Sequence, residues 1–361
     1  MRILEIHYST AWAGAERVVV DLSNELSHTN EVILCTILDD SLPGKSYYKK
    51  DLLPDIKYIN LKCQRGLQIK ALWRVYKLIK NLKPDIVHAH TDLMVLFLPA
   101  LLYRKTKYFH TLHSLANKCL KRNYLKNIYK WLYTKRIQAI TISKVCLNSY
   151  IQLYHLNNAI KIDNGRSQLC PSNKIKETSD EIKKLKLHPD DKVFVHVARC
   201  EKAKNQSLLV STFKKILDEN IHAILLMIGA NYDNPNNKAL FNNMPKGMYC
   251  LGVKNNICDY LLNADFFILS SLWEGLPISL LEAISCGVIP ISTPAGGIPD
   301  VISDENKGFI SVDFTENNFY STIKNALSHE QTFDKEHLKK YFNNNFSMKH
   351  CAELYFKAFL S

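Results

Sequence analysis

No run of hydrophobic residues in this sequence is long enough to cross a bilayer as a helix. The longest apolar stretch, residues 93–103, is interrupted by Pro99, whereas a membrane-spanning helix needs about 20 predominantly apolar residues. The first residues follow the pattern of a strand that contains Glu5, with no small-residue cleavage site, so we expect no signal peptide. Hydrophobic residues make up 47% of the chain and charged residues 22%, as in ordinary globular domains. These features predict a cytoplasmic protein.

The sequence also lacks the usual signatures of metal, disulfide and dinucleotide sites. Its ten cysteines are scattered singly, with no Cys-x-x-Cys pair, which indicates reduced thiols rather than a zinc site or a disulfide framework. There is no Asp-x-Asp pair, so we expect an activity that needs neither a metal nor another cofactor. No Gly-x-Gly-x-x-Gly follows the first strand, which argues against a dinucleotide-dependent dehydrogenase.

Acidic residues are absent between Asp92 and Asp163, a stretch that carries 12 Lys and Arg residues. The net charge of +13 lies entirely in residues 1–165, which hold 25 basic and 12 acidic residues, whereas residues 166–361 hold 22 of each. Residues 117–136 alternate basic side chains with Leu, Ile, Tyr and Trp at helical spacing. Such a basic helix is typical of a surface that binds anionic lipid. One alternative is a helix packed on its own domain. A nucleic-acid surface is not expected, because no nucleic-acid-binding module accompanies the charge.

Strand and helix patterns alternate along both halves of the chain, which predicts two doubly wound α/β domains. A polar stretch at 163–191 separates them and is interpreted as a linker. We expect domains over 1–165 and 166–345, with a ligand at the carboxyl ends of both sheets in the cleft between them, and an amphipathic helix over 346–361 that packs back on the first domain. The predicted strands are 2–8, 31–38, 84–90, 108–113, 139–143, 192–198, 223–229, 266–269 and 288–293. The predicted helices are 15–26, a helix that ends with residues 76–81, 206–220, 257–263 and 278–285.

Two carboxylates lie eight residues apart in Ser-Leu-Trp-Glu-Gly-Leu-Pro-Ile-Ser-Leu-Leu-Glu (271–282). The Glu-Gly-Leu-Pro turn opens an apolar run, which places Glu274 at the mouth of a helix and Glu282 about two turns further along. Unpaired N–H groups at a helix mouth attract anions such as phosphate. A buried carboxylate in the apolar surroundings of Glu282 would need a partner. A phosphate-binding mouth, with one acid toward a sugar and one toward a ribose diol, suits a nucleotide-sugar site. The alternative is a capping acid followed by an exposed helical acid.

Two cations, Arg199 and Lys204, lie in the segment 197–206 between a predicted strand and a predicted helix. A guanidinium grips a diphosphate in bidentate fashion, and an ammonium acts on it as a point charge. The two groups would stabilise the negative charge that develops as a diphosphate leaves, without a bound metal. The alternative is a pair of surface cations in a loop.

Other candidate residues lie at turns after predicted strands. Gly14 follows the first strand, where a residue without a side chain lets the backbone approach a ligand. His113 ends the strand 108–113, and its competitors are His88, His90 and His110, of which at least one is expected to be a core histidine. The remaining motifs are Asn-Gly at 164–165, Gly-Val-Lys-Asn-Asn-Ile at 252–257 and Gly-Gly-Ile-Pro-Asp at 296–300.

Together these ordered motifs resemble glycosyltransferase family 4, the retaining nucleotide-sugar transferases of GT-B fold, over essentially the whole chain. The resemblance implies two Rossmann-like domains that face each other across a cleft, the first binding the acceptor and the second the donor. It implies Glu274 and His113 as catalytic residues, with His113 on the transferred sugar and Glu274 as nucleophile or electrostatic stabiliser. The donor-binding residues that it implies are Gly14, Arg199, Lys204, Val253, Gly275, Leu276, Pro277, Ile278 and Glu282. One departure is that residues 227–231 keep only the first glycine of the usual Gly-x-Gly.

The resemblance further implies a hexosyltransferase that uses a UDP-sugar before other donors. Its acceptor would be a glycan or a lipid-linked saccharide in lipopolysaccharide, O-antigen or capsule assembly, at the cytoplasmic membrane face. Two alternatives stay open at this point. A sugar-nucleotide epimerase on the same scaffold would turn over the donor without an acceptor, and a non-catalytic basic binding protein would keep its activity without Glu282.

Overall fold

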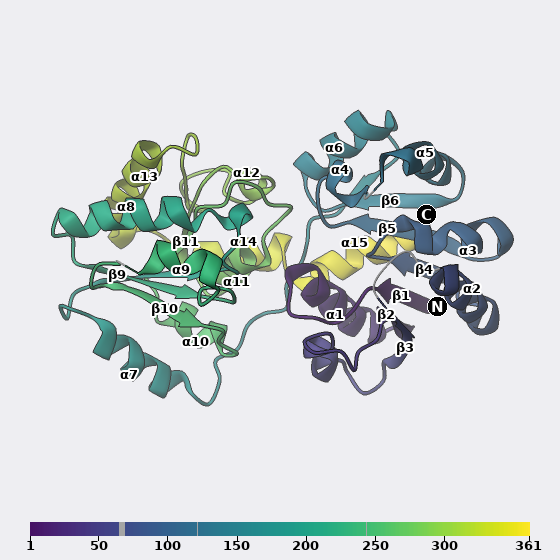
Figure 1. Cartoon of the computed structure of the whole chain (residues 1–361), viewed down its shortest axis with the longest axis horizontal. Helices are drawn as coiled ribbons and strands as arrows, with labels where there is room; N and C mark the ends of the chain where they lie inside the picture. Colours follow the sequence, from purple (N-terminus) through teal and green to yellow (C-terminus); the bar gives the residue numbers. More distant parts are fainter. Residues whose placement is uncertain (65–68, 121, 243) are drawn as a thin grey trace. The chain divides into compact units, whose positions relative to one another are not determined.

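Two units, each built around one parallel β-sheet, make up the chain (Figure 1). The computed structural model describes residues 1–64, 69–120, 122–242 and 244–361. Unit 1 comprises Met1–Ser167 and Asn345–Ser361, and unit 2 comprises Gln168–Asn344. The predicted domain boundaries followed residues 165 and 345, and the structure has them after residues 167 and 344.

The sheet of unit 1 has the strand order β3-β2-β1-β4-β5-β6-β7, with parallel neighbours. Strands of this kind are buried on both faces, and their sequences are therefore nearly continuous hydrophobic runs. The strands are β1 (Arg2–His7), β2 (Glu31–Leu38), β3 (Lys57–Cys63), β4 (Ile86–Ala89), β5 (Lys107–Leu112), β6 (Ile137–Thr141) and β7 (Ile160–Lys161). The helices are α1 (Gly14–Ser27), α2 (Ile69–Leu82), α3 (Phe97–Leu102), α4 (Ala116–Cys119), α5 (Lys126–Lys135), α6 (Lys144–Tyr154) and α15 (Met348–Leu360), with single turns η1 (Tyr47–Asp51), η2 (Leu93–Leu96) and η3 (Asn123–Leu125).

The two faces of this sheet have different partners, because side chains alternate along each strand. Leu4 and Ile6 of β1 belong to a core cluster that includes buried residues of α2 and α5. Glu5, between them, belongs to the opposite face. There α15, from the other end of the sequence, packs on the sheet, and the ring of Tyr355 lies 5.1 Å from that of His88 (Figure 1). The second face therefore has a polar centre under the C-terminal helix.

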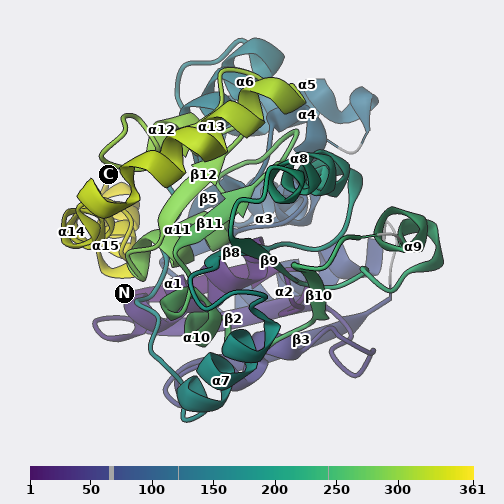
Figure 2. The ribbon, with the colours of Figure 1, turned by 90° about the vertical axis from the view of Figure 1, so that its left-hand side faces the viewer.

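The sheet of unit 2 has the order β10-β9-β8-β11-β12-β13, again with parallel neighbours. Helices α8 and α13 cover one face and α10 and α11 the other (Figure 2). On the first face, Phe194 of β8 packs with Phe213 of α8 and Phe319 of α13 in one core cluster. The strands are β8 (Lys192–Val197), β9 (Ala223–Ile228), β10 (Met248–Gly252), β11 (Phe266–Leu269), β12 (Ile289–Ser292) and β13 (Phe309–Ile310). The helices are α7 (Ile175–Leu185), α8 (Gln206–Asp218), α9 (Pro235–Phe241), α10 (Ile257–Leu262), α11 (Ile278–Ser285), α12 (Ile298–Val301), α13 (Glu316–His329) and α14 (Lys335–Asn345), with single turns η4 (Lys202–Lys204) and η5 (Glu330–Thr332).

The basic segment 117–136 is not the single helix that the sequence predicts. Helix α4 ends at Cys119, and Leu120 has ψ of 90°, outside the helical range, before η3 and α5 follow. The break resets the helical phase, so that Leu120 and Leu125 are both buried although they are five residues apart. The apolar side chains therefore divide into a buried set and an exposed set. Position 121, predicted as part of the same basic helix, lies outside the described residues.

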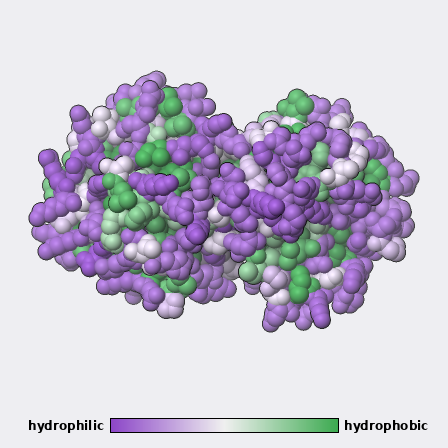
Figure 3. All heavy atoms as spheres, turned by 180° about the vertical axis from the view of Figure 1, so that it is seen from behind, coloured by the Kyte–Doolittle hydropathy of each residue, from purple (hydrophilic) through white to green (hydrophobic). Residues whose placement is uncertain are grey.

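The predicted linker 163–191 is also wrong in part, because it contains α7. Thr178 and Ile182 of this helix are buried in unit 2 although its composition is strongly charged. A hydrophobic face of a few residues is enough to hold a helix whose other sides face water. Within the described residues, no helix combines the length and the apolar character that crossing a membrane requires. In the view of Figure 3, hydrophilic residues cover most of the surface and hydrophobic residues form small separate groups.

The two chain segments that leave and re-enter unit 1 are tied to each other and to α1. Arg166 donates its backbone N–H to the carbonyl of Phe346 (2.9 Å), and Met348 donates to the carbonyl of Arg166 (3.0 Å). The guanidinium of Arg166 also donates to Asp21 Oδ2 over 2.6 Å. Asp21, only 1% exposed, accepts from Arg17 on its other oxygen over 2.9 Å. One buried carboxylate thus joins helix α1 to the segment that leaves unit 1, and this segment is in turn bonded to the one that returns.

We predict that Asp21→Asn lowers the free energy of unfolding of the protein by about 3–5 kcal/mol, because it leaves two guanidinium groups without their buried counter-ion. The matched control is Asp51→Asn, whose side chain is 33% exposed and lies 2.7 Å from Arg17; a pair of this kind contributes about 1 kcal/mol or less. Urea unfolding followed by tryptophan fluorescence measures both. Equal effects of the two substitutions would contradict the anchoring role of Asp21.

Candidate active site

The predicted donor-site residues of unit 2 lie on loops at the carboxyl ends of its strands. The strand order reverses between β8 and β11, and open α/β sheets bind ligands at such a point because the loops on either side diverge there. Arg199 and Lys204 follow β8, and Glu274 follows β11. The topology therefore brings together residues that are 70 positions apart in the sequence.

Lys204 and Glu274 form an ion pair at this point. Lys204 Nζ donates to Glu274 Oε1 over 2.6 Å, and Ser271 Oγ donates to the same oxygen over 2.7 Å. The side chains are 18% and 9% exposed, so the pair is shielded on most sides but reachable from solvent. The backbone beneath it is fixed as well, because Ser270 Oγ donates to the carbonyl of Lys204 (2.9 Å). The two sequence motifs thus meet in one charged pair.

The backbone of Glu274 is held by the Gly-Gly motif of the next loop. Gly296 has φ of +60°, and a Cβ atom there would lie 1.8 Å from the carbonyl oxygen of Glu274. Gly297 donates its N–H to the carbonyl of Gly275 over 2.9 Å. Only glycine fits at position 296, since it tolerates both the positive φ and the close approach. The motif at 296–300 therefore supports the Glu274 loop.

The N-terminus of helix α11 comes directly after the Glu274 loop in the sequence. Pro277 is the N-cap with extended backbone (ψ 123°), and Ile278 begins the helix. Leu276, Pro277 and Ile278 are buried, whereas Gly275 is partly exposed. Of the four residues 275–278, only Gly275 is thus exposed enough to face a ligand, together with the backbone N–H groups of the first helical turn. The apolar side chains of the other three residues fix the loop in the core.

Arg199, Val253 and Glu282 are the remaining predicted donor residues of unit 2. The Arg199 side chain is 49% exposed and reaches Glu201 at 3.4 Å, a weak contact that a stronger anion can replace. Val253 is 50% exposed just after β10. Glu282 is half-buried on α11 while its neighbours Leu281 and Ala283 are buried. Each side chain retains the exposure that ligand contact requires.

Of the two positions of the usual Gly-x-Gly beside Arg199, Gly229 occupies the first and Asn231 the second. Gly229, the one that is kept, has φ of +153°, and a Cβ atom there would lie 1.9 Å from the carbonyl oxygen of Ala198. Its N–H donates to the carbonyl of Gly252 over 2.8 Å. The first glycine is thus needed for packing against the Arg199 loop, whereas Asn231 adopts the left-handed conformation (φ +70°) that glycine favours at the second position.

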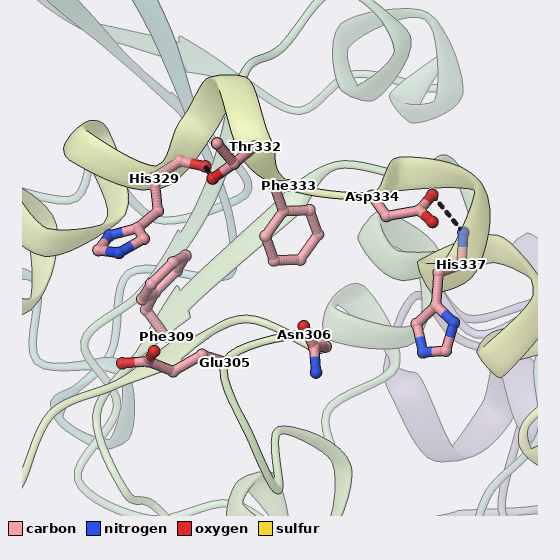
Figure 4. Close-up of a pocket in the computed structure, with 8 residues that line it drawn as sticks. All are labelled: Glu305, Asn306, Phe309, His329, Thr332, Phe333, Asp334 and His337. Atoms are coloured by element: carbon pink, nitrogen blue, oxygen red, sulfur yellow. Dashed lines mark hydrogen bonds between the residues drawn. The ribbon is translucent and has the colours of Figure 1, made fainter.

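A separate pocket of unit 2, of about 370 Å³, contains none of the predicted residues (Figure 4). It lies between the segment that leads into β13 and the connection from α13 to α14, where Asp334 accepts from the N–H of His337 over 2.8 Å. Phe309, which lines it, is the first residue of β13. The pocket is therefore at the amino end of that strand, whereas the candidate residues follow the carboxyl ends of strands.

In unit 1, the strand order reverses between β1 and β4. Gly14 is exposed and begins α1, after Ala13, which has extended backbone. His90 follows β4 and His113 follows β5. Both histidines and the start of α1 thus lie in the loops or turns at the carboxyl ends of the strands.

A hydrogen-bond network that the sequence alone did not reveal connects these histidines. Glu5 of β1 is completely buried and lies 2.7 Å from His90 Nε2 through Oε2, and 3.0 Å from His88 Nδ1. His90 Nδ1 lies 2.9 Å from His113 Nε2. His88 Nε2 lies 2.8 Å from Thr111 Oγ1. Of the competing histidines, His90 is therefore the one that contacts His113. The sequence signal that could have indicated this network was a carboxylate inside an otherwise apolar strand.

The charge states in this network follow from burial and pairing. Burial alone would raise the pKa of Glu5, but attraction to His88 and hydrogen bonds from both imidazoles outweigh it and lower the pKa to about 2. Burial lowers the pKa of His90 to about 3, with the neighbouring His88 adding to the effect. Burial likewise lowers the pKa of His110 to about 4; its ring lies 2.7 Å from Tyr133 OH and stays apart from the network. An ionised carboxylate therefore faces a neutral imidazole.

Within the described part of the chain, Glu5, His88 and His90 are also the one group of three side chains whose ligand-type atoms lie within 4.8 Å of one another. Their nitrogen and oxygen atoms already satisfy each other as hydrogen-bond donors and acceptors. The cluster is thus complete as a network of buried polar groups.

Two family models match the chain. Residues 12–165 match the model described as Glycosyltransferase Family 4, and residues 177–345 match the model described as Glycosyl transferases group 1. Among known proteins, UDP-Gal:alpha-D-GlcNAc-diphosphoundecaprenol alpha-1,3-galactosyltransferase of Escherichia coli is 28% identical over 335 residues, which are 86% of this chain and 84% of that protein. An N-acetylgalactosaminyltransferase of Campylobacter jejuni, named for a diphospho-undecaprenol substrate, is 24% identical over 93% of this chain and 91% of its own length.

Solved structures show the same architecture. A glycosyltransferase from Rickettsia africae superposes with a TM-score of 0.82 at 19% identity, covering 99% of this chain and 97% of that one. Anabaena HepE, solved in complex with UDP and glucose, gives a TM-score of 0.81 at 15% identity, covering 99% of both chains. The predicted fold class of two Rossmann-like domains is confirmed. The chain belongs to the glycosyltransferases of the family 4 and group 1 models and has their GT-B fold.

Proposed function

We propose that this enzyme transfers a hexose, with retention of anomeric configuration, from a UDP-sugar to a lipid-linked or glycan acceptor in the assembly of a bacterial surface polysaccharide such as lipopolysaccharide, O-antigen or capsule. The observation that carries the proposal is the ion pair of Lys204 with Glu274 at the point where the strand order of unit 2 reverses. It combines a cation suited to a departing diphosphate with an anion suited to the positive charge of a reacting sugar.

The pair accounts for the division of roles between its two residues. An ammonium group has three donors, so Lys204 can keep its bond to Glu274 while it donates to a phosphate oxygen. Within the described part of the chain, the Arg199 guanidinium has a weak contact to Glu201 as its one ion pair, so it can then close on the diphosphate in bidentate fashion. No metal is required for this arrangement, which supports metal-independent transfer.

The surroundings of Glu274 favour an electrostatic role over covalent catalysis. Its Oε1 accepts from both Lys204 and Ser271, and two such bonds draw electron density from the whole carboxylate and make it a weaker nucleophile. A fixed negative charge near the anomeric carbon stabilises an oxocarbenium-like transition state. We therefore favour front-face displacement within an ion pair, with Glu274 as the stabiliser and His113 on the transferred sugar.

The substrate classes follow from the relatives. The name of the E. coli relative specifies UDP-galactose and a diphosphoundecaprenol acceptor, and Anabaena HepE binds UDP and glucose. By analogy, we propose a uridine diphosphate donor, with Val253 beside the base and Glu282 on the ribose hydroxyls. A lipid-diphosphate acceptor is consistent with the basic composition of residues 1–165.

We predict that UDP raises the thermal unfolding temperature of the protein, whereas GDP and ADP do not. A ligand specific for the folded state stabilises it by about 2.7 kcal/mol at a hundredfold excess over Kd. Lys204→Ala and Glu282→Ala should each reduce this shift and lower sugar transfer by about a hundredfold or more, because each removes a pre-aligned contact.

The matched controls are Lys202→Ala and Glu316→Ala, which remove exposed charges of the same kinds from unit 2. Near-normal transfer in the Lys204 or Glu282 variant would overturn the site. Turnover of the UDP-sugar without any acceptor saccharide would instead indicate an epimerase. Ligand binding without any sugar transfer, unchanged in Glu282→Ala, would favour a non-catalytic binding protein.

Removal of metal ions provides a further prediction. Because two cationic side chains are assigned to the diphosphate, transfer should continue at near-normal rate in excess EDTA, measured by release of UDP. Restoration of a lost activity by Mg²⁺ or Mn²⁺, but not by Ca²⁺, would contradict metal independence.

We also propose that the exposed part of segment 117–136 rests on an anionic membrane. Tyr124 is 71% exposed and Trp131 43%, and Lys126 and Lys130 lie in the same helix as Trp131. Aromatic rings at the headgroup level and lysines near anionic lipid each contribute favourably, by about 1 kcal/mol per lysine. Leu125 and Leu132 are buried, so packing of this helix on its own domain and contact with a membrane are compatible.

Vesicle binding tests the membrane surface. The protein should co-sediment with vesicles of phosphatidylglycerol and phosphatidylcholine at low salt and dissociate as salt is raised. The double variant Tyr124→Ser/Trp131→Ser should bind several-fold more weakly. Trp73→Ser, which removes a 48% exposed tryptophan elsewhere in unit 1, is the control and should bind normally. Equal binding by all three proteins would exclude this surface.

A further inference from the structure

The hydrogen bonds from Glu5 to His113 have a direction that their donors and acceptors fix. An ionised carboxylate only accepts, so the proton in the 2.7 Å contact between Glu5 Oε2 and His90 belongs to His90 Nε2. Because the pKa of His90 is lowered to about 3 by burial, its ring is neutral at pH 7 and Nδ1 carries a lone pair. The 2.9 Å contact with His113 Nε2 then requires His113 to be the donor.

His113 therefore ends the chain with a bare acceptor. Burial, with the neighbouring imidazoles, lowers the pKa of His113 well below its ordinary value, so the ring is neutral and its single proton lies on Nε2. Nδ1 has a lone pair, is buried, and has no hydrogen-bond partner among the described residues. The residue as a whole is only partly buried. A buried polar atom without a hydrogen-bond partner is destabilising, so this position favours a ligand that supplies a hydrogen.

We propose that Glu5 is a positioning residue that acts through His90 to hold His113 in the tautomer whose Nδ1 accepts a hydrogen bond from a substrate sugar hydroxyl. The proposal rests on the proposed function, because it takes a sugar-bearing substrate as the ligand. A hydroxyl group donates, whereas the ionised oxygens of a phosphate only accept. Nδ1 of His113 thus selects a sugar hydroxyl and rejects a phosphate oxygen, and the carboxylate at the far end of the chain determines this choice.

A second branch of the same network provides an internal control. His88 also faces Glu5, but its other nitrogen lies 2.8 Å from Thr111 Oγ1, which in turn lies 3.1 Å from Tyr355 OH. This branch ends on α15, away from His113. Tyr355→Phe removes a buried hydrogen bond from the network while the path from Glu5 to His113 remains.

The tautomer of His113 can be measured in the unmodified protein. In the full chain labelled with [¹⁵N]histidine, long-range ¹H–¹⁵N spectra at pH 7 distinguish a ring protonated at Nε2 from one protonated at Nδ1. The signals of His113 are assigned by their absence in His113→Asn. A neutral ring with its proton on Nε2 is expected. A proton on Nδ1, or on both nitrogens, would overturn the proposal whether or not the enzyme transfers sugar.

Kinetics test the path from Glu5. Glu5→Gln removes the negative charge and leaves one accepting oxygen for the two imidazoles that face Glu5. The hold on the His90 proton is thereby weakened, so the variant should lower kcat/KM at least tenfold, whereas Tyr355→Phe should change it less than threefold. In a His113→Ala background, Glu5→Gln should have almost no further effect, because its path is already cut.

A loss of equal size in both backgrounds would show that Glu5 acts only on the fold and would overturn the positioning role. Absence of transfer by the wild type with any nucleotide sugar would instead overturn the proposed function, while the spectrum still decides the tautomer. If Glu5→Gln does not fold, a proton on Nδ1 in the wild-type spectrum still overturns the proposal.

Discussion

Burial of a charged carboxylate is unfavourable unless a cation or a hydrogen-bond donor lies beside it. The pairs that satisfy this requirement hold distant parts of this structure together. A carboxylate without a partner would be destabilised by several kcal/mol. Asp21 is paired with two guanidinium groups and thereby joins α1 to the segment that leaves unit 1. Glu274 is paired with Lys204 across two loops of unit 2. Glu5 is paired with the imidazoles of His88 on β4 and His90 just after it. Each requirement links parts of the chain that are far apart in the sequence.

Parallel-sheet topology explains why two of these pairs lie where chemistry is possible. The carboxyl ends of parallel strands share one edge of the sheet, and connecting loops diverge where the strand order reverses. In unit 2, this point separates the Arg199–Lys204 loop from the Glu274 loop. In unit 1, it separates β1, which carries Glu5, from β4, which carries His88. A charged group is unfavourable in the middle of a hydrophobic sheet. The pair in unit 2 therefore lies in loops at the carboxyl ends of the strands, and Glu5 lies beside its imidazole partners.

The sequence predicted what depends on local pattern. The strands at 31–38 and 266–269 and the helix at 278–285 agree with the structure to the residue, because hydrophobic runs bounded by turns leave little freedom. The single helix at 117–136 was wrong, since only tertiary packing could show that Leu120 and Leu125 reach the same core across a break. The polar helix α7 was missed for the opposite reason: its buried face is too small to stand out from its charge.

The candidate site, too, could be predicted from the sequence only in part. Motif spacing was enough to single out Lys204 and Glu274, but their 2.6 Å contact depends on which strands are neighbours, and that information is not local. Glu5 shows the limit more clearly. In the sequence it is one acid in a short strand, and only the register of β1 with β4, which sets Glu5 opposite His88, gives it a partner.

The two units therefore carry charge in different ways. In unit 2, a cation and an anion are paired in a shielded position that solvent still reaches, so a diphosphate can also bind to the lysine. In unit 1, the anion is completely buried and has neutral imidazoles beside it on the path to His113, so it determines the position of a proton and no mobile ion is required. The large positive charge of residues 1–165 contributes nothing to that interior network. Net charge thus describes the surface that unit 1 presents to a partner, whereas hydrogen-bond direction determines what its buried histidines can recognise.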